Sequence, residues 1–194
     1  GFCSAQILDS PKGLSFMQDG ILDMRLGPAS NEDGLTAADI VNSWSKQEIA
    51  TLIQEYGEER FAWRIAEAIF LARKTARIVG TLDLVAVIKK AVPGGYEQGR
   101  IHPATRTFQA LRMAVNDEIP ALKEAVHAAH RILRPGGRCA VITFHSIEDR
   151  VMKHLFQDEE LWTPLTKRPL VPSDAECERN PRARSAKLRV ATRR

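Results

Sequence analysis

The stretch that decides the fold is residues 131–150, RILRPGGRCAVITFHSIEDR. A helix is predicted to end at the letters RPGG, and an apolar run from Cys139 to Phe144 follows it. An apolar run between glycine and proline punctuation is typical of a strand buried on both faces, as in parallel α/β sheets. Open α/β sheets bind ligands beyond the carboxyl ends of their strands, where His145 and Ser146 would lie. We therefore predict an α/β fold with a candidate site at these two residues.

The elements on either side of this strand support the same class. Upstream, the letters NDE at 116–118 open a helix that runs to the Pro-Gly-Gly turn. Downstream, Ser146 with Asp149 three residues later is the pattern of a helix N-cap. Helix, strand and helix in this order form a unit of a doubly wound sheet. A final strand is predicted at Lys187–Thr192, antiparallel and at an edge of the sheet.

A block of short helices precedes this unit, over residues 34–111. Thr36 and Ser45 each begin a capping box, with an acidic residue three positions later. Thr81 is predicted to cap a further helix, and Pro103 to occupy the first position of another. No convincing strand pattern interrupts the block, so it reads as a helical module.

Composition and charge restrict the function classes. The 194 residues are 44% hydrophobic and 27% charged, which is a globular composition. The net charge is +4, but residues 179–194 hold six Arg, one Lys and no acid, which leaves about −3 elsewhere. Such a strip suits the phosphates of nucleic acid, and a solvated basic terminus is the alternative.

Three cysteines without CxxC spacing argue against a disulfide framework or a zinc site. No apolar run approaches the roughly 20 residues that span a bilayer.

Motifs with known chemistry do not occur: the sequence contains no GxGxxG, P-loop, HExxH or GxSxG. His145 is therefore a candidate by position alone. Ser146 has helix capping as an alternative role, and the letters EDR at 148–150 are explained by the helix dipole. Asp19, Asp23 and Arg25 form a charged loop, either with an unknown partner or as a surface salt-bridge cluster.

Five strings, in order, carry a resemblance to one family: QILDSPKGLSFMQDGILDMR, EYGEERFAWRIAEAI, HPATRTFQALRMAVNDE, LRPGGRCAVITFHSIEDRVMK and NPRARSAKLRVA. The chain resembles the ribosomal RNA small-subunit methyltransferase H family, also called MraW, over nearly its whole length. The resemblance implies a Rossmann-like class I methyltransferase fold with an inserted all-helical domain. Residues 1–33 and 112–194 would then belong to the methyltransferase domain, and residues 34–111 to the helical insertion that recognises RNA.

The resemblance also implies an activity and a set of site residues. The activity is S-adenosylmethionine-dependent methylation of the N4 amine of a cytosine in the decoding region of 16S rRNA. The letters GFCSAQ match the end of the family's DLGxSSxQ segment, so Gln6 and Gly1 are the implied cofactor contacts. As a hypothesis, the catalytic residues in the pocket for the target base are Ser4, His145 and Ser146, and the sequence does not say which residue polarises the amine. Those that hold RNA phosphates would be Arg182, Arg184, Lys187 and Arg189.

The expected partner is small-subunit rRNA or the assembling small subunit, with no metal and no membrane; a homo-oligomer stays open. The sequence begins without Met, and the family's glycine-rich loop and ribose-binding acid do not occur in it. We therefore expect the 194 residues alone to bind the cofactor poorly and to transfer no methyl group. The alternative function is a non-catalytic RNA- or ribosome-binding protein that retains the helical module and the basic tail. The expected location is the bacterial cytoplasm, or an organelle for a eukaryotic source.

Overall fold

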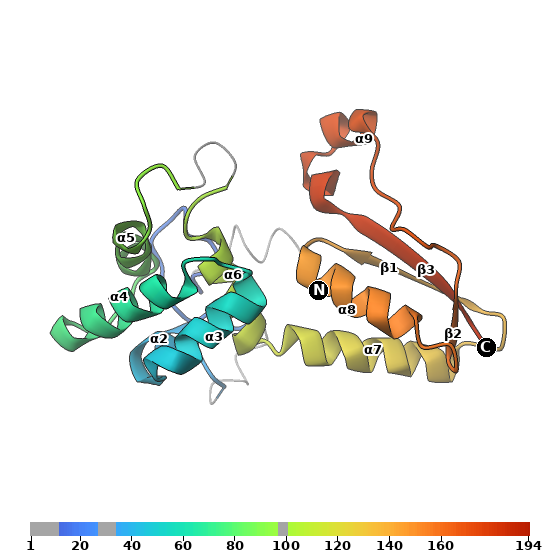
Figure 1. Cartoon of the computed structure of the whole chain (residues 1–194), viewed down its shortest axis with the longest axis horizontal. Helices are drawn as coiled ribbons and strands as arrows, with labels where there is room; N and C mark the ends of the chain where they lie inside the picture. The colour runs from blue at the N-terminus through green and yellow to red at the C-terminus, as the bar shows by residue number, and fades with distance from the viewer. Residues whose placement is uncertain (1–11, 27–33, 97–100) are drawn as a thin grey trace. The chain divides into compact units, whose positions relative to one another are not determined.

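The computed structural model describes residues 12–26, 34–96 and 101–194. The chain divides into two compact units, Gly1–Glu118 and Ile119–Arg194, and each has its own hydrophobic core (Figure 1). The described part of the first unit is helical, whereas the second combines helices with a sheet, so the fold is mixed α/β as predicted. None of the described helices has the length and apolar character needed to cross a membrane.

The described part of the first unit contains five helices: α2 Ala37–Ser43, α3 Lys46–Gly57, α4 Ala62–Thr75, α5 Thr81–Ala91 and α6 Thr105–Val115. The described residues between 34 and 111 contain no strand, as the sequence predicts. Apolar residues three or four positions apart place one face of each helix in a common core. The fully buried side chains of this core include Ile40, Ile53, Ile65, Ile69, Leu84, Ile88 and Leu111.

Both predicted capping boxes are confirmed. The Thr36 hydroxyl accepts from the Asp39 amide at 3.1 Å, and the Asp39 carboxylate accepts from the Thr36 amide at 3.1 Å. Ser45 and Glu48 make the same exchange at the start of α3. The bonds to Thr36 hold the pKa of Asp39 below its usual value, because they stabilise the ionised carboxylate.

The prediction that Thr81 caps α5 is wrong. Gly80 is the N-cap, and its amide donates to the Asp83 carboxylate at 3.3 Å. Thr81 is instead fully buried, where its hydroxyl accepts from the Gly20 amide at 3.0 Å and donates to the Gln18 carbonyl at 2.8 Å. The threonine thus fastens a distant loop rather than its own helix.

Helix α6 also starts later than predicted. Nδ1 of His102 accepts from the Ala104 amide at 3.2 Å, and its ring stacks on Phe16 with centroids 4.8 Å apart. This local turn precedes the helix, so α6 begins at Thr105 and not at Pro103. Burial and the charge of Lys89 lower the pKa of His102.

The second unit contains a three-stranded sheet. Its elements are α7 Glu118–Ile132, β1 Arg138–Thr143, α8 Ser146–Phe156, β2 Trp162–Pro164, α9 Asp174–Arg179, the 3-10 helix η2 Pro181–Ser185 and β3 Lys187–Arg193. The order is β1-β3-β2, and both outer strands are antiparallel to β3. The predicted final strand is therefore antiparallel, but it is central among the described strands and not at an edge. Strands β1 and β2 run parallel to each other and are joined through α8.

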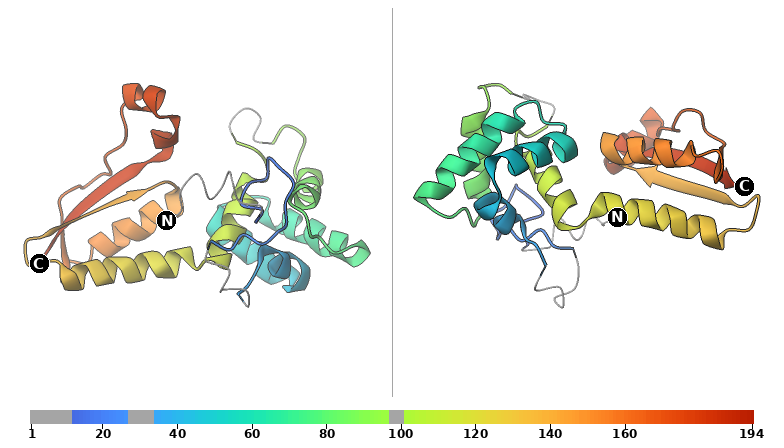
Figure 2. Two further views of the ribbon diagram at one scale, coloured as in Figure 1. Left: turned by 180° about the vertical axis from the view of Figure 1, so that it is seen from behind. Right: turned by 60° about the horizontal axis from the view of Figure 1, so that its bottom comes forward.

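Only one face of this sheet is covered by the described helices. Residues of α7, α8 and β2 pack with Cys139 and Val141 of β1 and Ala191 of β3. Helices α7 and α8 lie alongside the strands in each view (Figures 1 and 2). Because strand side chains alternate between faces, Ile142 points the other way and is 57% exposed. The prediction that both faces of this strand are buried is therefore wrong for the described residues.

Candidate functional site

The candidate site begins where β1 ends and α8 starts. The N-cap of α8 is His145 and not Ser146, because Nδ1 of His145 accepts from the Glu148 amide at 3.3 Å. The Glu148 carboxylate contacts the residues that precede the helix. Its Oε2 accepts a hydrogen bond from the Phe144 amide at 2.9 Å, and the same atom lies 3.4 Å from Nε2 of His145. An acceptor at Nδ1 places the proton of the neutral imidazole on Nε2, which faces a carboxylate. Ser146 takes the first helical position and is exposed.

A cavity of about 220 Å³ lies beside this helix start. It is lined by Phe144, His145, Ser146, Val171 and residues 184–187. Residues 184–187 reach this cavity because β3 pairs with β1 in a register that sets Lys187 opposite Thr143. Two groups of predicted residues, His145 with Ser146 and Arg184 with Lys187, therefore meet at one cavity. Two cations beside hydrogen-bonding side chains can hold an anionic group.

The other two predicted RNA contacts lie elsewhere. Arg182 is exposed on η2 and does not line this cavity. Arg189 is buried, and Nε and Nη2 of its guanidinium donate to Asp149 at 2.6 and 3.2 Å. Nζ of Lys187 lies 3.5 Å from the same carboxylate. The bonds from Arg189 are the main reason that the pKa of Asp149 lies below its usual value.

Asp149 is a residue that the sequence reasoning missed as part of the site. The sequence analysis explained Asp149 by helix capping and by the helix dipole, yet its carboxylate contacts both Lys187 and Arg189 of β3. A sequence signal did exist: Lys187 and Arg189 are two positions apart in a predicted strand, and so they face the same way. Only the fold shows that the helix on that face supplies an acid.

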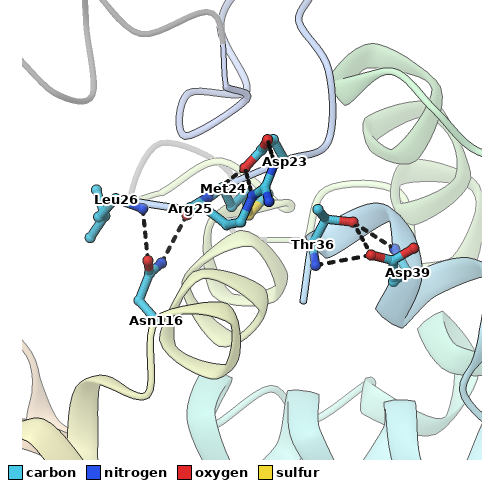
Figure 3. A network of polar contacts seen from close by, with 7 residues as sticks. All are labelled: Asp23, Met24, Arg25, Leu26, Thr36, Asp39 and Asn116. Carbon is cyan, nitrogen blue, oxygen red and sulfur yellow. Dashed lines mark hydrogen bonds and ion pairs between the residues drawn. The ribbon is translucent and has the colours of Figure 1, made fainter. Parts of the chain in front are cut away.

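The charged loop left open by the sequence belongs to the first unit and forms a buried network (Figure 3). Asp23 is 8% exposed and accepts from Nε and Nη2 of Arg25 at 2.8 and 2.7 Å. These bonds lower the pKa of Asp23. Asp19 is separate: its Oδ1 accepts from the Gly20 amide at 3.0 Å. The description as a surface salt-bridge cluster is therefore wrong for Asp23, which is internal.

Asn116 ties this loop to the end of α6. Its Oδ1 accepts from the Leu26 amide at 2.8 Å, and its Nδ2 donates to the carbonyls of Met24 and Arg112 at 2.8 and 2.9 Å (Figure 3). Met24 is fully buried with φ at 63°, a left-handed conformation that side chains rarely adopt. Two side-chain hydrogen bonds from Asn116, to Leu26 and Met24, and the surrounding core hold that conformation in place.

The remaining predicted site residues, Gly1, Ser4 and Gln6, lie outside the described residues. Their roles stay predictions.

The profile of the MraW methylase family matches residues 1–194, and the chain belongs to this family. It is 51% identical over 193 residues to the ribosomal RNA small subunit methyltransferase H of Synechococcus elongatus, which covers 100% of this chain and 63% of that protein. Proteins of the same name from Deinococcus deserti and Deinococcus radiodurans are each 50% identical over 193 residues, and 62% and 60% of their lengths are covered together with 100% of this chain. The resemblance read from the five strings is confirmed. The chain spans about 60% of the length of these curated relatives.

Proposed function

We propose that this chain is part of an S-adenosylmethionine-dependent methyltransferase that acts on small-subunit rRNA. The observation that carries the proposal is the family match over residues 1–194, with relatives at about 50% identity that are named for this activity. The acceptor we propose is the N4 amine of a cytosine in the decoding region of 16S rRNA. The bacterial cytoplasm, where small subunits assemble, is the proposed location.

The topology of the second unit supports a Rossmann-like fold. Strand β1, helix α8 and strand β2 form a β-α-β unit whose strands are parallel, with β3 inserted between them. Parallel strands joined through a helix are the building unit of α/β sheets, and in open α/β sheets ligands bind at the carboxyl ends of the strands. The cavity at His145 lies at such an end of β1.

The donor supplies an electrophilic methyl group on a sulfonium. We keep Gln6 and Gly1 as its proposed contacts, and because both lie outside the described residues we assign the donor no geometry.

The acceptor amine is a poor nucleophile, since its lone pair is delocalised into the cytosine ring. The protein must hold the base unstacked and accept hydrogen bonds from the amine. The cavity residues Ser146 and His145 are the proposed acceptors, together with Ser4. Nδ1 of His145 already accepts a hydrogen bond from the Glu148 amide, and Ser146 lines the same cavity.

The phosphates of the substrate are assigned to the basic residues around the same cavity. Arg184 and Lys187 line it and would hold the phosphate of the flipped nucleotide. Arg182, exposed on η2, would extend the contact along the strand. Arg189 contributes through its ion pair with Asp149, which fixes the orientation of the Arg189 side chain on β3.

The test uses the full-length protein, small subunits from cells without the gene, and a labelled methyl donor, with the modified base identified by mass spectrometry. Transfer to a cytosine amine in small-subunit rRNA is expected, and RNA binding without transfer would favour the non-catalytic alternative. His145→Asn keeps an N-capping side chain, so it separates chemistry from folding. A loss of about 10²-fold or more in rate would support a catalytic His145, and an unchanged rate would remove it from the list. The predicted inactivity of the 194 residues alone is measured in the same assay.

A further inference from the structure

A second cavity lies in Ile119–Arg194, and of the residues that line it only Arg189 was predicted to contact RNA. Its volume is about 260 Å³, and it lies between α8, the segment after β2, and β3. Lys153, Lys167 and Arg189 contribute cations to its lining, while Phe156 and Pro164 contribute apolar surface. None of the residues that line it is acidic.

Arg189 supplies this cavity with a donor that is fixed in position. The side chain is 9% exposed, and two of its nitrogens, Nε and Nη2, bind Asp149. This bidentate contact holds the guanidinium plane, so little rotamer entropy remains to be lost on binding. In the described part of the chain, its third nitrogen, Nη1, has no hydrogen-bond partner. The arginine can therefore take a further acceptor at no cost to the pair.

The charges around the cavity do not balance. Asp149 neutralises one unit of charge and is shared between Arg189 and Lys187, whereas Lys153 and Lys167 line the cavity as well. The carbonyl oxygens in the last turn of α8 carry partial negative charge, but they already accept hydrogen bonds from the Gln157 and Asp158 amides. A surplus of positive charge with a buried guanidinium favours an anion.

The size of the cavity limits what that anion can be. Sites for complete small molecules usually measure about 300–1,000 Å³. At about 260 Å³ this cavity suits a single phosphate with part of its sugar. We propose that it binds a backbone phosphate of single-stranded RNA, held by Lys153, Lys167 and Nη1 of Arg189. This rests on the proposed RNA substrate, and it adds a contact outside the candidate site.

Strand β3 contributes to both cavities. Lys187 lines the cavity at His145, and Arg189 lines this one. The two residues are two positions apart, a rise of about 6.6 Å along the strand, so their side chains face the same way. Asp149 contacts both, and one strand therefore offers cations to two cavities.

The test compares two double variants with the same change in charge. K153A/K167A removes both exposed lysines of the cavity, and K123A/R168A removes two exposed cations that do not line it. Binding of a fluorescent single-stranded RNA to the 194-residue chain is measured from 50 to 300 mM salt. For single strands the slope of log K against log salt is about −0.7 for each phosphate neutralised. K153A/K167A should lose about 0.7 from the magnitude of the slope, while the control keeps the wild-type slope.

Equal slopes for the two variants would overturn the proposal. If the wild-type chain binds no RNA at all, the proposed substrate fails, and the cavity is then tested by itself with inorganic phosphate. Shifts of the Thr166 and Arg189 amide resonances that are absent in K153A/K167A would uphold an anion site. No shift there would overturn it.

Discussion

Asp149→Asn tests whether one carboxylate positions the basic face of β3. The carboxylate binds Arg189 at 2.6 and 3.2 Å and lies 3.5 Å from Lys187, and the Asp149 and Arg189 side chains are 13% and 9% exposed. Removing one partner of a fully buried pair costs about 3–5 kcal/mol, because the other charge is left uncompensated. Asparagine keeps one acceptor and the pair retains some solvent contact, so we expect a loss of about 2 kcal/mol.

The loss depends on pH in a defined direction. The pKa of Asp149 is lower in the folded chain than in the unfolded one, chiefly because Arg189 donates to the carboxylate. Its stabilisation is therefore complete above the unfolded pKa of about 3.9 and disappears as the pH falls through the folded value. The difference between wild type and Asp149→Asn should be full at pH 7 and should shrink as the pH falls below the unfolded pKa of about 3.9.

The assay needs a probe that belongs to the same unit. Trp162 is 1% exposed and packs against the rings of Phe156 and His130, with ring centroids 5.2 and 5.1 Å from its own. With Trp44 and Trp63 replaced by Phe, its fluorescence during urea unfolding reports on this core. Glu124→Gln, an exposed charge change on α7, is the control. A loss equal to that of the control, or one that does not shrink at low pH, would refute the reasoning.

Four further outcomes are expected. Glu58→Gly should stabilise the chain by about 1 kcal/mol in thermal unfolding, since Glu58 ends α3 with φ at 51°. Gly57→Ala should destabilise it, because the new Cβ would lie 2.8 Å from the Arg106 carbonyl oxygen. Asn116→Ala should cost about 2 kcal/mol and speed hydrogen exchange of the loop that it holds, and unchanged exchange would contradict that role. In a variant with the other cysteines replaced by Ser, Cys139 should react with a disulfide reagent at pH 8 more slowly than free cysteine, because burial raises the pKa of its thiol.

Local chemistry was readable from the sequence where a residue interacts within a few positions. The capping boxes at Thr36 and Ser45 depend only on side chains three residues apart, and both were predicted. The prediction that Thr81 caps α5 failed because its hydrogen-bond partners are Gln18 and Gly20, more than 60 positions away. A hydroxyl before an apolar run predicts a cap only when no distant backbone group competes for it.

The candidate site divides in the same way, and strand order explains why. His145 was predicted from its place at the end of an apolar strand, which is a local feature. Its neighbours Arg184 and Lys187 were predicted as part of a basic tail, and nothing local indicated that they meet His145. They do so because β3 pairs with β1 in a register that sets Lys187 opposite Thr143. An edge position next to β2 alone would have left the basic residues away from α8, so the insertion of β3 between the two parallel strands is what assembles the site. The same insertion faces Arg189 toward Asp149, which turns a charged tail into a positioned surface with two cavities.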